Sequence, residues 1–246
     1  MSLESIWLVC LLFFTISTLY SSVGFGGGSS YIALLSLSSL SIIEIRSTAL
    51  LANILVVTIN LLVFSQNFKI PWKAAIQLCS LSIPLAFFGG LIHLTNKIFF
   101  MLLGSILILA ALSMFLQSIN TSPKPLIKKS NNFLVSGFIG FISGLVSIGG
   151  GIFLSPYLYL SDWNKPKQIA ATSSLFILVN SIAAFTGLAI RNSIELDPHL
   201  IWLLLSVTTG SFLGKKITLS QAGPRVLRGL TALLVFVVGV KIFLTL

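Results

Sequence analysis

The sequence has little charge and very few acidic residues. Of its 246 residues, 8% are charged and only five are Asp or Glu, whereas 56% are apolar and the mean hydropathy is +1.05. A soluble domain is about one quarter charged, and a fold of this length has too little interior to hide so much apolar surface. The scarcity of charge therefore excludes a soluble domain and indicates a protein whose solvent is the lipid bilayer.

Several chemical signatures are also missing. The two cysteines, Cys10 and Cys79, lie in apolar runs without a CxxC or metal-ligand spacing, so no metal or other cofactor is expected. The sequence lacks a nucleophile elbow, a P-loop and an HExxH motif, which argues against an enzyme. The net charge of +10 is explained by basic loops that face anionic lipid, so the bilayer is an expected partner and nucleic acid is not.

The apolar residues form long continuous runs, which predict an all-α, polytopic membrane protein rather than a barrel. The polar stretch 120–131, which contains Pro123 and Pro125, is predicted to link a first membrane repeat, 1–119, to a second, 132–246. Ten hydrophobic segments are expected, at 5–23, 27–40, 46–66, 72–93, 97–118, 132–148, 150–161, 168–190, 199–214 and 226–246.

Two motifs recur half a chain apart. Residues 23–28 read Val-Gly-Phe-Gly-Gly-Gly and residues 146–151 read Val-Ser-Ile-Gly-Gly-Gly, an offset of 123. Residues 86–90 match residues 210–214 at an offset of 124, and both place small residues four apart, which lets helices approach closely. Because each half holds five segments, the second half is predicted to be an inverted copy of the first.

The basic residues in the loops predict a topology. If all ten segments cross, 11 Lys or Arg lie on one side and 4 on the other, whereas fusing each glycine-containing pair into one broken crossing gives 7 against 8. The positive-inside rule favours the biased arrangement, with the 120–131 linker cytoplasmic and both termini outside the plasma (inner) membrane. Re-entrant glycine-rich segments give the same sides, and the 14 residues of 27–40 rise only about 21 Å against about 30 Å of hydrocarbon, so both alternatives stay open.

The two glycine runs form the candidate site for a small anion. Broken backbone persists in a bilayer only where protein or water covers it. A helix that restarts after glycines offers free N–H groups and a positive dipole end, both of which suit an anion. The alternative is that the glycines serve only close helix packing. The predicted site comprises Gly24, Gly26, Gly27, Gly28, Ser29 and Ser30 in the first half and Ser147, Gly149, Gly150 and Gly151 in the second.

Polar residues inside the segments extend this site. Asn53, Thr172, Ser173 and Asn180 are predicted to line the pore, with ordinary interhelical hydrogen bonding as the alternative. Arg46 is predicted to attract anions at an outer vestibule, and the alternative is an interfacial ion pair with Glu44. All five acids fall at segment ends or in loops, so none indicates a buried cation or proton path.

At the glycine runs the chain resembles the TauE/SafE family, the sulfite exporter or toluene-sulfonate uptake permeases. The resemblance lies in residues 24–28, in residues 144–151 with Pro156, in Ala-Thr-Ser at 171–173 and in Phe-Leu-Gly at 212–214. It implies a secondary transporter or facilitator of sulfite, sulfonates or related anions, working by alternating access between inverted repeats. A coupling ion such as H⁺ or Na⁺ is a further expected partner.

The first half departs from the family pattern. Ser-Ser-Tyr stands at 29–31 where a proline often follows the glycines, and Ser-Thr-Ala stands at 47–49 where Ala-Thr-Ser is expected. These departures bear on the identity of the substrate. A passive anion channel and a non-transport assembly or interaction protein are the alternatives, and the lack of any polar loop longer than about a dozen residues favours transport.

Overall fold

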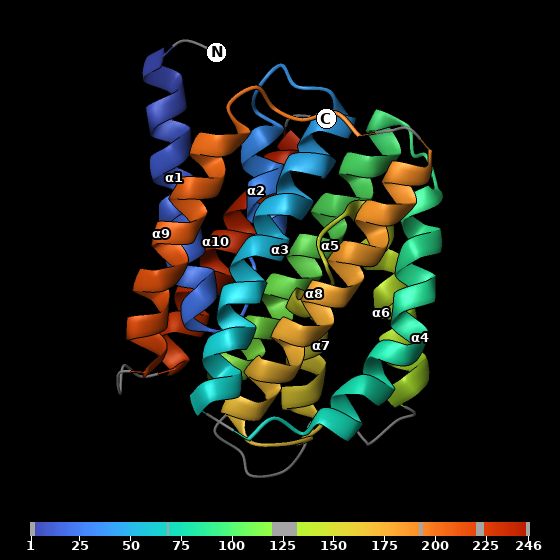
Figure 1. Cartoon of the computed structure of the whole chain (residues 1–246), viewed down its shortest axis with the longest axis vertical. Coiled ribbons are helices and arrows are strands. Elements are labelled where there is room, and N and C mark those ends of the chain that lie inside the picture. Colours follow the sequence, from blue (N-terminus) through green and yellow to red (C-terminus); the bar gives the residue numbers. More distant parts are fainter. Residues whose placement is uncertain (1–2, 68, 120–131, 192–193, 220–223, 245–246) are drawn as a thin grey trace.

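The structure is a computed structural model that describes residues 3–67, 69–119, 132–191, 194–219 and 224–244. All elements in these ranges are helices, which confirms the predicted all-α class (Figure 1). They are α1 (Leu3–Ser22), α2 (Gly28–Leu35), α3 (Ile42–Asn67), α4 (Trp72–Leu91), α5 (Asn96–Ile119), α6 (Asn132–Val146), α7 (Gly151–Leu160), α8 (Pro166–Ile190), α9 (Leu200–Leu219) and α10 (Pro224–Leu244).

Four of the described helices are long and apolar enough to cross a membrane. They are α3, α4, α8 and the Asn96–Leu116 part of α5. Shorter apolar helices cover Ile6–Ser22, Asn132–Val146 and Gly151–Leu160. These lengths and compositions define a multi-pass membrane protein.

The boundary between α2 and α3 differs from the prediction. The segment expected at 27–40 is helical only to Leu35, because the hydroxyls of Ser36 and Ser38 donate to the carbonyls of Ala33 and Leu35 and close a turn. The next helix starts at Ile42 rather than at residue 46. Ser41 explains the early start, since Glu44 N donates to Ser41 Oγ over 3.1 Å while Ser41 N donates to Glu44 Oε2 over 2.8 Å, a reciprocal capping box.

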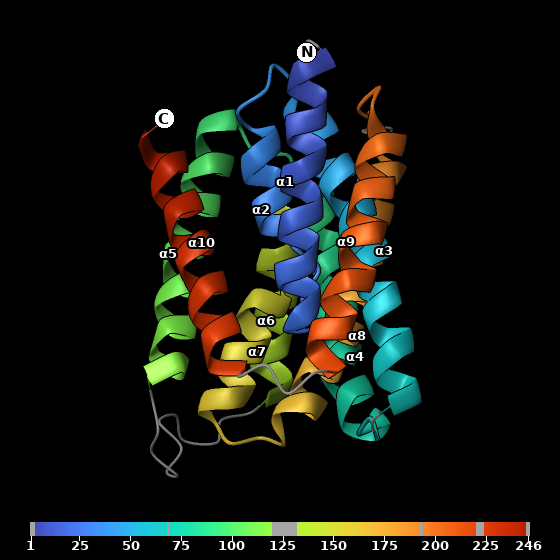
Figure 2. The ribbon, with the colours of Figure 1, turned by 90° about the vertical axis from the view of Figure 1, so that its left-hand side faces the viewer.

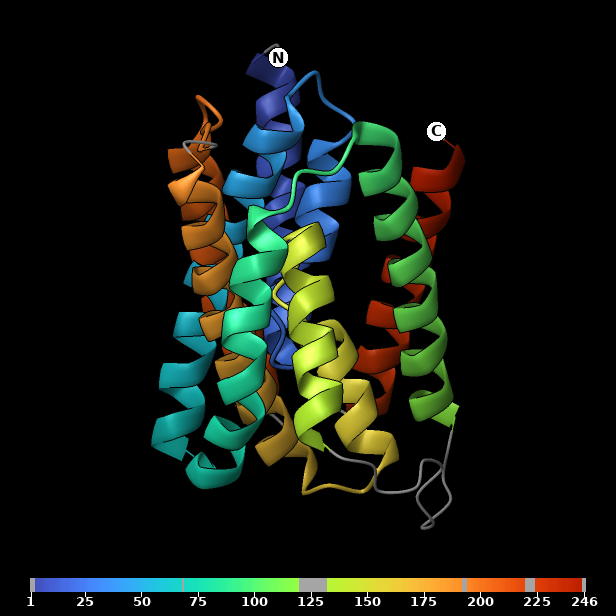
Figure 3. The same ribbon diagram turned by 90° about the vertical axis from the view of Figure 1, so that its right-hand side faces the viewer.

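Each glycine-rich segment forms a helical hairpin. Helix α2 returns along α1 toward the end of the molecule where α1 begins (Figure 2). Two contacts fix this hairpin: Tyr20 Oη and Ser30 Oγ lie 2.7 Å apart, and the rings of Phe13 and Tyr31 stack with centroids 4.6 Å apart. The hairpin of α6 and α7 enters from the opposite end (Figure 3). Each hairpin therefore begins and ends at the same end of the molecule, and the two hairpins enter from opposite ends.

The chain ends and the loops sort onto two ends of the molecule. The start of α1 and the end of α10 lie at one end, and the end of α5 and the start of α6 lie at the other (Figures 1 and 2). The loops that precede α4 and α8, the end of α9 and the start of α10 share the α5–α6 end. The predicted basic-rich side is thus one end of the molecule, although the linker lysines of 120–131 lie outside the described residues.

The helix packing has an internal correspondence. Helix α1 packs along α9 as α6 packs along α4, and α3 with α8 and α5 with α10 pair across the halves. Every principal helix contact has a counterpart when each helix is exchanged for the one five places further along. Small residues make the closest of these contacts, since a Cβ at Gly144 would overlap the Ala86 carbonyl and one at Gly210 the Phe14 carbonyl.

Candidate functional site

Two turns with left-handed residues lie at the tips of the hairpins. Gly24 and Gly27 have φ of 85° and 87°, and their counterparts Ser147 and Gly150 have φ of 59° and 80°. Gly149 is also left-handed, with φ of 74°, whereas its counterpart Gly26 is not. This left-handed region suits glycine because it has no Cβ. Gly27 and Gly150 directly precede α2 and α7, so each turn presents the N-terminus of a short helix to the interior.

Asn53 of α3 lies between the two turns. Its side chain is 1% exposed, its Oδ1 accepts a hydrogen bond from Gly28 N over 3.2 Å, and its Nδ2 donates to Ser181 Oγ over 2.9 Å. A Cβ at Gly26 would overlap Asn53 Oδ1, and a Cβ at Gly149 would lie 2.7 Å from Asn53 Nδ2. The structure thus brings Asn53 together with glycines of both runs, as the sequence predicts for a shared site.

Arg46 lies against the second turn. It is 3% exposed; its Nε donates to Ser147 Oγ over 2.7 Å and its Nη2 to the Gly144 carbonyl over 3.3 Å. Its Cζ stands 5.8 Å from the centroid of the Phe99 ring. Glu44 serves the capping box instead, and within the described ranges no carboxylate lies within ion-pair distance of Arg46. Arg46 is therefore a buried cation without a counter-charge from the described residues.

Other side chains hold the first turn in place. Ser174 Oγ of α8 donates to the Gly24 carbonyl over 2.8 Å, and Asn60 Nδ2 of α3 donates to the Phe25 carbonyl over 3.0 Å. Asn60 also accepts a hydrogen bond from Ser21. Asn60 and Ser174 were not among the predicted site residues. The signal for Asn60 is its spacing, because it follows Asn53 by two helical turns and so lies on the same face of α3.

At the first residue of the short helix, the second turn has an apolar neighbour where the first has Asn53. A Cβ at Gly151 would overlap Ile177, and a Cβ at Gly150 would lie 3.0 Å from both Ser143 Oγ and Phe176 Cε1. Among the described residues, nothing accepts a hydrogen bond from Gly151 N–H, the first amide of α7. This buried amide therefore keeps an unused hydrogen-bond donor.

The remaining predicted residues are buried without joining the turns by hydrogen bonds. The hydroxyls of Thr172 and Ser173 and Oδ1 of Asn180 have no partner in the described part of the chain, and Asn180 Nδ2 donates to its own helix at Phe176. Ser30 binds Tyr20, and Ser29 is 3% exposed. A buried polar atom without a partner costs about 1–3 kcal/mol, so three of them in one helix are consistent with groups that await a ligand or water.

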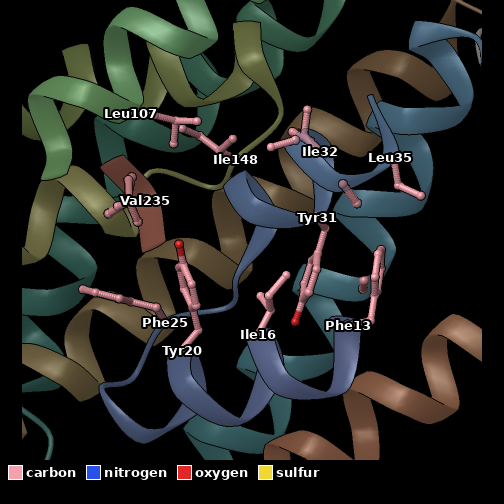
Figure 4. Packing of buried hydrophobic residues seen from close by; sticks show 14 of the residues in the cluster. Phe13, Ile16, Tyr20, Phe25, Tyr31, Ile32, Leu35, Leu107, Ile148 and Val235 are labelled. Carbon is pink, nitrogen blue, oxygen red and sulfur yellow. The ribbon is translucent and has the colours of Figure 1, made fainter. Parts of the chain in front are cut away.

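Apolar side chains surround the two turns. In the first hairpin Phe13 and Ile16 lie beside Tyr31, and Tyr20 lies beside Phe25; Ile148 of the second turn lies beside Leu107 (Figure 4). This cluster excludes water, which lowers the local dielectric constant and strengthens any charge interaction with Arg46.

The long apolar helices, the two helical hairpins and the buried polar turns define the class, a multi-pass helical membrane protein with a polar site inside the bundle. The chain belongs to the TauE/SafE family, because the family described as "Sulfite exporter TauE/SafE" matches residues 9–242. The resemblance seen at the glycine runs is thereby confirmed. The chain is also similar to the "Probable membrane transporter protein y4hK" of Sinorhizobium fredii (strain NBRC 101917 / NGR234), at 32% identity over 247 residues, covering 98% of this chain and 99% of that protein. No solved structure matches the chain.

Proposed function

We propose that this protein is a secondary transporter, or facilitator, of small sulfur-containing anions such as sulfite or sulfonates. The observation that carries the proposal is Arg46, a buried guanidinium without a carboxylate partner in the described ranges, held against a glycine turn between the halves. An isolated buried charge is costly, so the site favours an anion that neutralises it. Membership in a family described as a sulfite exporter and similarity to a protein named as a membrane transporter support the substrate class and the process.

Alternating access between two inverted repeats is the proposed mechanism. The five-helix correspondence and the opposite entry of the hairpins support it (Figures 2 and 3). At the end with the chain termini, Ser41 Oγ donates to Glu195 Oε2 over 2.8 Å and Asp197 N to Thr48 Oγ1 over 3.4 Å. At the other end, Gln168 Nε2 donates to the Lys69 carbonyl over 3.1 Å. Each set joins the two halves, and transport would release one set at a time.

In the proposed orientation the α5–α6 end faces the cytoplasm and both termini lie outside the plasma (inner) membrane. The basic residues beside the starts of α4 and α8 and the end of α9 support it. Single cysteines at the exposed positions Lys97 and Lys165, in a background without Cys10 and Cys79, provide the test. An impermeant thiol reagent added outside cells should label position 97 and spare position 165, and the reverse pattern would invert the topology.

Flux of radiolabelled sulfite and methanesulfonate into proteoliposomes tests the function. Uptake should exceed that of protein-free liposomes, and unlabelled anion inside should accelerate entry of labelled anion, because an alternating carrier returns faster when loaded. Imposed H⁺ and Na⁺ gradients test which ion is coupled. Flux without acceleration would indicate a passive channel, and no flux of any sulfur anion would contradict transport.

A further inference from the structure

The two turns differ in charge at equivalent positions. Ser147 follows Gly24 by 123 residues, and Ala170 follows Arg46 by 124. In the second turn Arg46 donates to Ser147 Oγ, whereas in the first turn a Cβ at Gly24 would lie 2.8 Å from the Ala170 Cβ. The same helix-to-turn contact is therefore made by a cation on one side and by a methyl group on the other. The duplicated backbone carries a single positive charge.

The charges inside the described bundle are few. Where burial is defined, Arg46 is the one buried Lys or Arg, and Asp197 is the one buried acid. Asp197 has its own partner, since its Oδ1 lies 3.2 Å from His199 Nδ1 and accepts from His199 N over 2.6 Å. Among the described residues, Arg46 is therefore the one buried positive charge that lacks an acidic partner.

Arg46 retains hydrogen-bonding capacity for such an anion. A guanidinium has five N–H donors, and the described residues accept from Nε and Nη2 alone. Nη1 is left without a protein acceptor in these ranges. The free Gly151 N–H and the buried hydroxyls of Thr172 and Ser173 add neutral donors within the same bundle.

We infer that the site selects singly charged anions, of the type R–SO₃⁻, over doubly charged ones such as SO₄²⁻. This inference rests on the proposed transport function. The attraction of an anion to one Arg46 charge grows in proportion to the anion's charge. The cost of removing the anion from water grows with the square of that charge in the Born description that sets the scale of ion desolvation. Doubling the charge of the anion therefore doubles its attraction to Arg46 and quadruples the cost of removing it from water. Hydrogen bonds from neutral donors offset only part of this added cost.

Competition against radiolabelled methanesulfonate uptake in proteoliposomes tests the inference, at constant ionic strength so that screening is equal. Unlabelled methanesulfonate and sulfate are tetrahedral sulfur anions that differ in charge, and perchlorate is a singly charged tetrahedral anion without a methyl group. We expect methanesulfonate and perchlorate to inhibit uptake at concentrations at least about tenfold below that of sulfate, the ratio produced by a difference of one hydrogen bond to a charge.

Substitutions of Arg46 test whether its positive charge causes the selectivity between anions. Arg46→Gln should weaken inhibition by methanesulfonate by roughly 10- to 100-fold and narrow its advantage over sulfate. Arg46→Lys keeps the charge and should keep the order of the anions, which also covers the case in which the Gln variant does not fold. Lys165→Gln is the matched control, because it removes an exposed cation at the start of α8 and should leave the order unchanged.

The outcomes separate the two proposals. Sulfate inhibiting as strongly as methanesulfonate in the wild-type protein would overturn charge selection and leave the transport function standing. Methanesulfonate inhibiting without perchlorate would show that the methyl group selects, and would also overturn it. No methanesulfonate uptake by the wild-type protein would overturn both.

Discussion

The two hairpins have similar backbones and different side chains. Gly24 and Gly27 are left-handed in the first turn, their counterparts Ser147 and Gly150 are left-handed in the second, and a short helix begins directly after Gly27 and after Gly150. In the first hairpin, Asn53 accepts a hydrogen bond from the amide of Gly28 at the start of the helix. In the second, Ile177 stands 124 residues after Asn53, packs against Gly151 and cannot accept.

The two turns therefore differ in the contacts that surround them. The first turn is held by amide and hydroxyl groups of Asn53, Asn60 and Ser174 and has its helix start capped. The second turn has an uncapped helix start and lies against Arg46. An anion is therefore expected to bind closer to the second turn, so the pseudo-symmetric bundle would have an off-centre site.

The largest expected effect comes from making the halves alike in charge. Arg46→Ala gives the second turn the residue type that faces the first, and we expect methanesulfonate affinity to fall at least about 100-fold, because a buried charge-assisted contact is lost. Ala170→Gly changes the counterpart position and should cost only about 1 kcal/mol of stability, as glycine does in a helix. Uptake assays and thermal unfolding in detergent measure the two effects. Equal losses of uptake in both variants would contradict an off-centre site.

The next effect concerns the residue between the turns. Asn53→Ala leaves Gly28 N–H and Ser181 Oγ without their partner, and we expect the free energy of unfolding to fall by about 2–4 kcal/mol. Ile177→Val at the counterpart position removes one methylene and should cost about 0.5–1.5 kcal/mol. Thermal unfolding of both purified variants compares them directly. If the Ile177 variant proves the less stable, Asn53 does not hold the turns together.

The backbone of both turns was predictable from the sequence because its signals are local. Glycines repeated at a half-chain offset, bounded by apolar runs, identify the turns and the helices beside them. The start of α3 was also readable, since Ser41 and Glu44 have the spacing of a capping box. The prediction missed it because Glu44 lies two residues from Arg46 and suggested an ion pair instead.

The side-chain partners were not predictable, because they depend on how the halves dock. Arg46 and Ser147 are 101 residues apart, and Asn53 and Ser181 are 128 apart. Residue type alone selected Thr172, Ser173 and Asn180, yet in the structure none of them binds a turn through its side chain. On the same helix, Ser174 donates to the Gly24 carbonyl of the first turn, and Ser181 accepts from Asn53, which lies between the turns. Polarity within an apolar run thus identifies the helix that faces the turns, whereas the partner of each side chain depends on the packing of the two halves.

A third prediction concerns the left-handed glycine that directly precedes the short helix in each hairpin. Gly27→Ala and Gly150→Ala each force a Cβ onto a left-handed residue, which costs about 1–2 kcal/mol. Their surroundings are equally tight, with Tyr31 atoms 2.9 Å from the added Cβ in the first turn and Phe176 and Ser143 atoms 3.0 Å away in the second. Thermal unfolding should therefore show losses of similar size. If only one of the two variants loses stability, the two glycines are packed unequally despite their similar backbone conformation.

The smallest expected effect lies in a hydrogen bond that the first hairpin has and the second lacks. Tyr20 Oη lies 2.7 Å from Ser30 Oγ, whereas residues 123 positions further along are Ser143 and Phe153, which cannot form this bond. Tyr20→Phe removes only the hydroxyl and should cost about 1 kcal/mol, which corresponds to a fall in Tm of about 2–4 °C for a chain of this size. Uptake should be unaffected, because the second turn is the proposed anion site.

Ser30→Ala and the double variant complete the test of this bond. If the two hydroxyls stabilise the protein only by bonding to each other, the variant with both substitutions should lose little more stability than Tyr20→Phe or Ser30→Ala alone. Additive losses would mean that Tyr20 and Ser30 contribute through other neighbours. A fall in methanesulfonate affinity in Tyr20→Phe, with stability unchanged, would place the first turn in contact with the anion and move the proposed site to the centre of the bundle.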